Sequence, residues 1–239
     1  MSSRYTYSHG ALIHFNVVQS LVSLILVISP LYAFSQTIEQ KMLDIGLVRV
    51  RDYAPKVMVD LKYNSTDNFV GVDMYGGLND AYLRPHMAER LRKAQVILER
   101  EYSPDYRIII YDAARPLSAQ RRMYDLVKGT PLKVYVASPH RGGRHNYGVA
   151  VDLSIWDLSQ GEPLDMGGDF DQFDAVSHVG QEDRLVRTGK ISAAAQKNRQ
   201  MLYSVMRRVG LVPYRREWWH YEQPESMSEV RRQYPLLDF

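Results

Sequence analysis

The chain has 239 residues, of which 45% are hydrophobic, 24% are charged and 11% are aromatic, and its formal net charge at pH 7 is +3. This length and composition fit one globular domain with an enclosed site, and the small charge without a basic, aromatic-rich run argues against a nucleic-acid partner. Cysteine is absent, which excludes disulfides and a cysteine nucleophile and leaves histidine and carboxylate side chains to bind any metal.

The first 35 residues predict a secretory signal peptide. They contain one charged residue, Arg4, and then an apolar run over about residues 17–34, with small residues at positions −3 and −1 of a cleavage point after Ser35. An uncleaved membrane anchor is the alternative, but Pro30 and several polar residues interrupt a run that is already at the short limit for a spanning helix. We therefore expect an exported, periplasmic protein whose mature part, residues 36–239, has no stable membrane insertion.

Residues 36–239 contain no internal repeat, low-complexity tract or linker, so we expect a single domain. Alternating apolar and polar residues predict half-buried strands at 48–53 and 57–63, and an Asn-, Asp- and Gly-rich stretch predicts a long loop at 64–79. Apolar residues at helical spacing then predict an amphipathic helix at 84–102. The β-branched run that follows predicts a buried strand at 107–111.

The second half of the chain shows a similar mixture. Its expected elements are a helix at 119–128, a strand at 149–155, a helix at 192–208 that Gly210 closes, and a last strand at 216–222. Because strands and helices follow one another in an irregular order, the sequence predicts an α+β fold. We expect a central, mostly antiparallel sheet with flanking helices.

His145 and Asp152 lie seven residues apart around Gly148. On a straight helix this separation would place them about 10.5 Å apart along the axis, and on a straight strand they would point to opposite faces. A turn at Gly148 could bring both side chains together, because glycine adopts backbone angles that other residues avoid. Asp152 would then share one strand face with the small residues Ala150 and Ser154. This arrangement predicts either a metal site or a structural histidine beside a paired strand carboxylate.

Two further segments carry candidate functional residues. Glu217 and His220 are three residues apart and could approach one ion only if the chain bends there, because a regular strand would point them to opposite faces. The aromatic residues around them could equally form part of the core. Asp112 and Arg115 follow the buried strand predicted at 107–111, which is a location typical of functional sites. The alternative is a surface ion pair, which contributes little to stability.

Together these segments resemble the zinc D-alanyl-D-alanine dipeptidases over most of residues 58–222. The resemblance rests on six motifs that follow one another in the order of the family. They are Asp60 to Tyr63; Asp67 to Phe69 with Gly71; Tyr111-Asp112 with Arg115-Pro116; His145 to Gly148 with Ala150 and Asp152; Asp165 to Gly167 with Phe170-Asp171; and Glu217 to His220.

The resemblance implies a zinc site on the sheet. In it, His145, Asp152 and His220 would bind one Zn²⁺ ion per chain, with water as the fourth ligand. By the same resemblance, Glu217 would be the general base toward that water. Arg115 would face the oxyanion that develops during peptide hydrolysis.

The resemblance also implies a site for the free amino group of a dipeptide, beside Tyr63 and Asp171. The chain departs from the family at Gly143, since the family usually has serine two residues before the first histidine ligand. The missing side chain leaves the metal ligands intact and puts this amine-binding pocket in question. We also expect the glycine-rich segment 74–77 to form a mobile flap over the site.

We therefore expect an exported zinc metallopeptidase of cell-wall peptide metabolism, which cleaves D-Ala-D-Ala or a similar D-configured dipeptide with zinc-activated water. One alternative is a D,D-carboxypeptidase or an endopeptidase that acts on peptidoglycan stem peptides, which a groove open on the amine side would favour. The other is a non-catalytic zinc-binding or wall-binding module. The presence of Glu217 argues against that module, because binding alone needs no general base.

Overall fold

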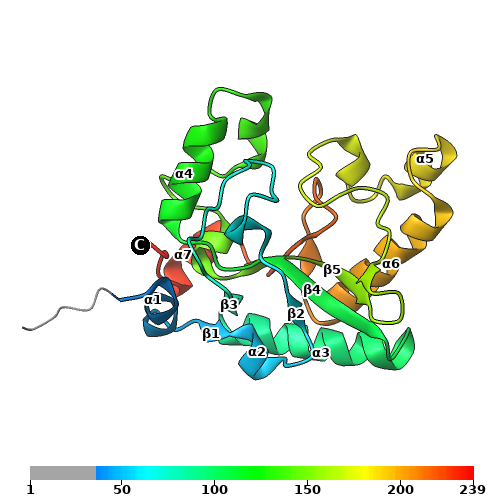
Figure 1. Ribbon diagram of the computed structural model, residues 1–239, viewed down its shortest axis with the longest axis horizontal. Helices are drawn as coiled ribbons and strands as arrows, with labels where there is room; N and C mark the ends of the chain where they lie inside the picture. The colour runs from blue at the N-terminus through cyan, green and yellow to red at the C-terminus, as the bar shows by residue number, and fades with distance from the viewer. Residues whose placement is uncertain (1–35) are drawn as a thin grey trace, which may run out of the picture. The chain divides into compact units, whose positions relative to one another are not determined.

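The computed structural model describes residues 36–239 (Figure 1). The predicted signal peptide, residues 1–35, lies outside the described residues. None of the helices in the described part combines the length and the apolar character that a membrane-spanning helix needs.

A six-stranded mixed sheet positions the site. Its strands run in the order β2 (Met58–Val59), β4 (Tyr106–Asp112), β5 (Ala150–Asp157), β8 (His220–Glu222) and β7 (Val212–Pro213), and β6 (Glu162–Pro163) pairs with β5. Only the β2–β4 pair is parallel. A separate antiparallel pair joins β1 (Val48–Arg49) to β3 (Tyr82–Leu83). The predicted α+β fold with a mostly antiparallel sheet is confirmed.

Helices flank this sheet (Figure 1). The α-helices are α1 (Ile38–Asp44), α2 (Val50–Tyr53), α3 (Pro85–Glu101), α4 (Leu117–Val127), α5 (Glu182–Arg187), α6 (Ala193–Arg208) and α7 (Met227–Gln233). The 3₁₀ helices are η1 (Lys62–Asn64), η2 (Pro131–Tyr135), η3 (Arg144–Tyr147) and η4 (Ala175–Ser177). Helix α3 packs against β4 and α6. In Figure 1, α4 with η2 lies on one side of the sheet's centre, and α5 lies on the other.

The helices end where local chemistry favours it. Pro85 opens α3 at a position where a missing N–H costs nothing and a fixed φ fits the helix. The Ser192 hydroxyl caps α6 by accepting from the Ala195 N–H at 2.9 Å. Gly210 follows that helix with a φ of 78°, the left-handed conformation expected of a residue that terminates a helix.

The core lies at the centre of the sheet. The register pairs Ile108 with Ile155 and Ile110 with Leu153, and all four side chains are fully buried. Each such burial contributes about 1.5–3 kcal/mol. Between Ala150 and Ser154, the other face of β5 carries small and polar side chains, as its alternating sequence predicts. This face is therefore available for a site.

Three predicted strands are shorter than expected. Only Val48–Arg49 of segment 48–53 is a strand, since the chain turns into α2 at Val50. Segment 57–63 is reduced to Met58–Val59. In segment 216–222 the strand begins at His220, because the N–H of Glu217 donates to the Tyr214 carbonyl at 3.2 Å and forms a turn. Short alternating runs cannot reveal such tertiary interruptions.

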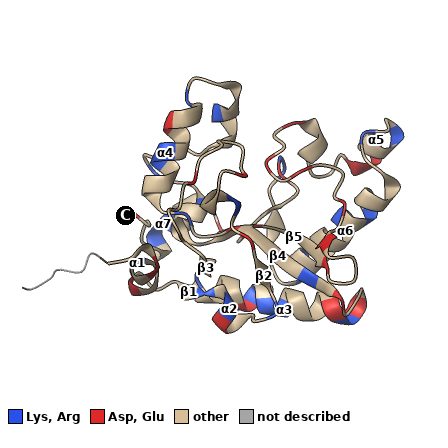
Figure 2. Cartoon of the chain, viewed as in Figure 1, with Lys and Arg blue, Asp and Glu red and all other residues tan. Residues whose placement is uncertain are grey.

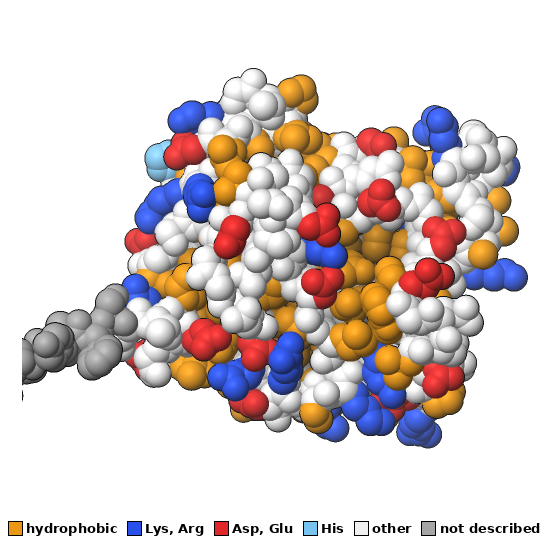
Figure 3. Space-filling view, viewed as in Figure 1, with side chains coloured by type: hydrophobic (Ala, Val, Ile, Leu, Met, Phe, Trp, Pro, Cys, Tyr) orange, Lys and Arg blue, Asp and Glu red, His pale blue; other side chains and the backbone are white. Residues whose placement is uncertain are grey.

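Charged residues of both signs are interspersed over the same helices (Figure 2). In the space-filling view, apolar side chains gather in a hollow beside the central strands, and charged side chains surround it (Figure 3).

Candidate active site

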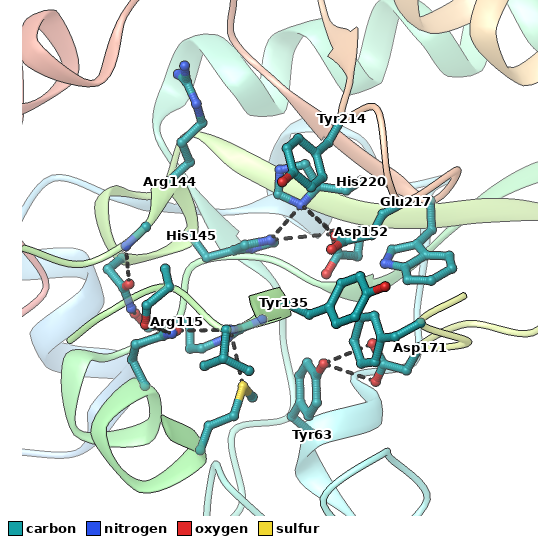
Figure 4. A pocket seen from close by; sticks show the side chains of 18 of the residues that line it. Tyr63, Arg115, Tyr135, Arg144, His145, Asp152, Asp171, Tyr214, Glu217 and His220 are labelled. Carbon is teal, nitrogen blue, oxygen red and sulfur yellow. Dashed lines mark hydrogen bonds and ion pairs between the residues drawn. The ribbon is translucent and has the colours of Figure 1, made fainter. Parts of the chain in front are cut away.

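Three side chains converge on one point, from neighbouring strands and from the turn before β5 (Figure 4). Asp152 and His220 are direct partners across β5 and β8, and His145 lies in η3. The Nδ1 atom of His220 lies 3.1 Å from Nε2 of His145 and 2.9 Å from Oδ1 of Asp152. The His145 Nε2 and Asp152 Oδ1 atoms are 3.4 Å apart. These three atoms could hold a metal ion.

The three donor atoms fit a tetrahedral metal. Ligand bonds of about 2.0–2.2 Å at tetrahedral angles place neighbouring ligand atoms about 3.3–3.6 Å apart, so the observed separations need to widen by only a few tenths of an ångström. Each histidine also has its second ring nitrogen occupied. His145 Nδ1 lies 2.7 Å from the Ala113 carbonyl, and His220 Nε2 lies 3.1 Å from Oε2 of Glu222. Such partners fix the orientation of metal-binding imidazoles.

The predicted turn at Gly148 is confirmed and carries His145 to this point. Gly148 has a φ of 72°, and its N–H donates to the His145 carbonyl at 3.1 Å. A β-carbon there would lie 2.5 Å from Cδ2 of Leu47, so both the conformation and the space require glycine. The same His145 carbonyl accepts from the N–H of Arg115 at 3.0 Å. The metal-binding turn and Arg115 are therefore tied together.

Glu217 lies beside the three donor atoms because the chain bends, as the metal hypothesis requires. Its Oε2 atom is 3.9 Å from Nδ1 of His220. Burial raises the pKa of Glu217 to about 7, although the positive charge of His220 lowers it. A carboxylate with this pKa can accept and return a proton near neutral pH.

Arg115 is a buried cation held by a hydrogen-bond network. Its Nε donates to Oδ2 of Asp112 at 3.1 Å, and its Nη1 donates to Oε1 of Gln120 at 2.9 Å. The Tyr75 hydroxyl donates to the other oxygen of Asp112. Burial alone lowers the pKa of Arg115, but the Asp112 carboxylate raises it well above its usual range. The surface ion pair considered as the alternative is excluded, because the Asp112 side chain is 0% exposed.

The segment expected to be a mobile flap is instead anchored. Met74 and Tyr75 are 7% and 2% exposed. The N–H of Met74 donates to the Tyr63 carbonyl at 2.8 Å, and the Tyr75 hydroxyl bonds to Asp112. The flap prediction is therefore wrong for Met74 and Tyr75, whose side chains pack inward, whereas Gly76 and Gly77 are exposed.

Tyr63 and Asp171 form the opposite part of the site. The Tyr63 hydroxyl donates to both carboxylate oxygens of Asp171, at 2.9 and 3.1 Å. Asp171 has a φ of 61°, which is uncommon for a residue with a side chain. Burial, and then the charge of Asp152, raise the pKa of Asp171 well above its usual range. A cation beside this carboxylate would relieve the cost of its burial.

The residues of the site line one cavity of about 250 Å³. Its lining includes all seven residues to which the family resemblance gives a role: Tyr63, Arg115, His145, Asp152, Asp171, Glu217 and His220. The volume lies below the roughly 300–1,000 Å³ of pockets for drug-sized ligands. The cavity therefore suits a small substrate.

Sequence reasoning missed several residues that hold the site. Glu222 follows His220 by two positions, so strand alternation could have placed it on the same face. Gln120, Tyr135 and Phe173 also line the cavity. They come from segments far apart in the chain, and no local pattern marks them.

Comparison with known proteins gives a consistent result. The model of peptidase family M15, described as D-ala-D-ala dipeptidase, matches residues 44–238. The chain is 33% identical over 183 residues to the D-alanyl-D-alanine dipeptidase of Escherichia coli (strain K12), covering 77% of this chain and 84% of that protein. It is 32% identical over 184 residues to that of Enterococcus faecalis (68% and 84% covered) and 31% identical over 199 residues to that of Enterococcus faecium (75% and 92% covered).

Proposed function

The chain belongs to the D-Ala-D-Ala dipeptidase family of peptidases, M15, and from that membership we propose that it hydrolyses D-Ala-D-Ala or a similar D-configured dipeptide with one zinc ion per chain. The observation that carries this proposal is the single small cavity that holds three metal-binding side chains, a buried glutamate and a buried arginine. The family makes the enzyme a metallopeptidase. The identities of its substrate as a D-configured dipeptide and of its metal as zinc are what we propose.

His145, Asp152 and His220 would hold the metal. Two imidazoles and one carboxylate, with room for a further ligand, form a donor set typical of catalytic zinc. When bound, the metal would activate a water molecule and polarise the scissile carbonyl.

Glu217 and Arg115 would perform the proton transfer and the charge stabilisation. Glu217 accepts a proton from the attacking water and returns it to the leaving amine, for which a pKa of about 7 is well matched. Arg115 presents a fixed positive charge to the carbonyl oxygen as negative charge develops there. Because Asp112 and Gln120 already hold the guanidinium, little reorganisation is needed during the reaction.

Asp171 would bind the free amino group of the dipeptide, with support from Tyr63. Its half-buried carboxylate lies on the wall of the cavity that holds the metal-binding side chains. An ammonium group would pair with this carboxylate and stabilise its charged form, whereas an acylated nitrogen carries no charge and would not provide that stabilisation. This arrangement favours a free dipeptide over an internal part of a longer peptide.

The decisive experiment compares three substrates: D-Ala-D-Ala, N-acetyl-D-Ala-D-Ala and a muropeptide pentapeptide, each with and without a chelator. We expect zinc-dependent hydrolysis of the free dipeptide and much slower reaction of the other two. Equal rates on the free and acetylated dipeptides would refute the role of Asp171. Preferential cleavage of the pentapeptide would instead indicate a carboxypeptidase or an endopeptidase.

We also propose that the protein is exported to the periplasm and recovers dipeptides derived from the cell wall. The charge-poor, apolar segment before Ser35 supports export. N-terminal sequencing of the protein from a periplasmic fraction tests this, with Gln36 as the expected first residue. A protein that keeps residues 1–35 and fractionates with membranes would contradict the cleaved signal.

A further inference from the structure

Tyr135 lies over the cavity, at the end of η2. Its ring stacks on that of Phe173, with ring centroids 4.6 Å apart and ring planes inclined by 25°. The two residues come from segments far apart in the chain, since η2 follows α4 and Phe173 precedes η4, and both line the cavity. Tyr135 lines the same cavity as Tyr63 and Asp171, and in the projection of Figure 4 its ring falls between Asp152 and Asp171. The stacked rings therefore bridge the cavity.

This bridge stands next to the proposed amine-binding carboxylate. Phe173 follows Asp171 by two residues, and its ring packs edge-on against Phe69 at 4.9 Å and against Trp219 at 6.0 Å. These aromatic side chains form one wall of the cavity that Asp171 also lines. A further residue on the amino side of a dipeptide would have to pass this wall.

One hydrogen bond holds the segment after η2, and a glycine lets it approach the turn before β5. The Gln120 side chain donates from Nε2 to the Ala137 carbonyl at 2.8 Å, while its Oε1 accepts from Arg115 at 2.9 Å. A β-carbon added at Gly143 would lie only 3.0 Å from Cβ of Ala137. The glycine thus allows this segment to approach the turn that carries His145. The position of Tyr135 is coupled to the catalytic arginine and to the metal-binding turn.

We propose that Tyr135 is a specificity-determining residue, whose ring, stacked on Phe173, closes the amine side of the cavity against peptides longer than a dipeptide. The inference rests on the proposed dipeptidase function and adds a steric barrier to the charge recognition by Asp171. The aromatic wall blocks the path of a longer substrate, and the Asp171 carboxylate binds the free amino group of a dipeptide.

The test compares kcat/KM for D-Ala-D-Ala with kcat/KM for the tripeptide L-Lys-D-Ala-D-Ala in zinc-loaded enzyme. In Tyr135→Ala, the ratio of tripeptide to dipeptide activity should rise at least about tenfold, the scale of steric discrimination in an apolar pocket. Tyr135→Phe is the matched control, because it keeps the stacked ring, and its ratio should remain at the wild-type value. Asp171 is unchanged in each variant, so its preference for the dipeptide cancels when the ratio of a variant is compared with that of the wild type.

Phe173→Leu removes the same stack from the opposite wall and should raise the ratio in the same direction. Zinc content and melting temperature identify which variants are folded. An unchanged ratio in folded, zinc-loaded Tyr135→Ala and Phe173→Leu, with both activities reduced equally, would mean a structural role and would overturn the inference. If the wild-type enzyme itself fails to cleave D-Ala-D-Ala, the proposed function fails instead, so the two failures are distinguishable.

Discussion

Replacing Asp112 by asparagine should destabilise the protein strongly, although the residue touches neither the proposed metal nor the substrate. Its carboxylate is fully buried and compensates the charge of Arg115, whose side chain is 9% exposed. Asparagine keeps the shape and one acceptor but removes the negative charge. The guanidinium then stays buried without a counter-charge, a situation that costs about 3–5 kcal/mol.

This cost converts into a measurable melting shift. In a domain of about 150–250 residues, each kcal/mol lowers the melting temperature by about 2–4 °C. Asp112→Asn should therefore melt about 6–20 °C below the wild type. Tyr75→Phe is the matched, milder variant, since it removes one hydrogen bond to the carboxylate and should cost about 1.5–3 kcal/mol, or about 3–12 °C.

The assay is thermal unfolding followed by circular dichroism, at one pH and with saturating zinc for all three proteins. A loss of kcat/KM should accompany the loss of stability in Asp112→Asn, because Arg115 loses its anchor. If Asp112→Asn melts within about 3 °C of the wild type, the carboxylate does not carry the compensating charge and the reasoning is wrong.

Four further predictions concern the metal site, the turn and a distant histidine. Glu217→Gln should keep its zinc, measured by elemental analysis, and lose about 10²–10⁴-fold in kcat; retained turnover would exclude Glu217 as the base. His220→Ala should be inactive, and added zinc should no longer raise its melting temperature as it does for the wild type. If zinc still raises the melting temperature of this variant, other ligands bind the metal. Gly148→Ala should cost about 1–3 kcal/mol in chemical denaturation, because the φ of 72° and the approach of Leu47 both oppose a side chain; an unchanged midpoint would contradict this. Burial lowers the pKa of His86 from 6.5, although a hydrogen bond to Gln223 raises it. The neutral His86 side chain therefore contributes its full stabilisation above pH 6.5, and this stabilisation is lost as the pH falls through the folded-state pKa. His86→Gln should therefore lose less unfolding free energy than the wild type between about pH 7.5 and pH 5, and equal losses would refute the assignment.

The sequence predicted the backbone geometry around β5 better than it predicted the lengths of the other strands. The alternation of β5 placed Asp152 among small residues, and Gly148 indicated the turn that carries His145 toward it. Both follow from local backbone geometry, which a single chain segment determines. The strand predicted at 216–222 was too long because the turn at Glu217 depends on the carbonyl of Tyr214.

Other parts of the site could not be predicted from local patterns. Tyr75 lies in a glycine-rich loop that suggested mobility, yet its hydroxyl bonds to Asp112 from 37 positions away. Tyr135 and Phe173 meet only because two separate segments fold over the same sheet. Contacts of this kind depend on tertiary packing, which overrides local propensity.

The direct pairing of Asp152 with His220 across β5 and β8 has a consequence for the lifetime of the enzyme. An ion bound to both would act as a staple between two central strands, and with His145 it would close a segment of 75 positions. Separating the strands would then require release of the ion, so metal occupancy would set the rate of unfolding and of proteolytic loss. An enzyme that had lost its metal would therefore lose its activity together with part of its resistance to unfolding and proteolysis.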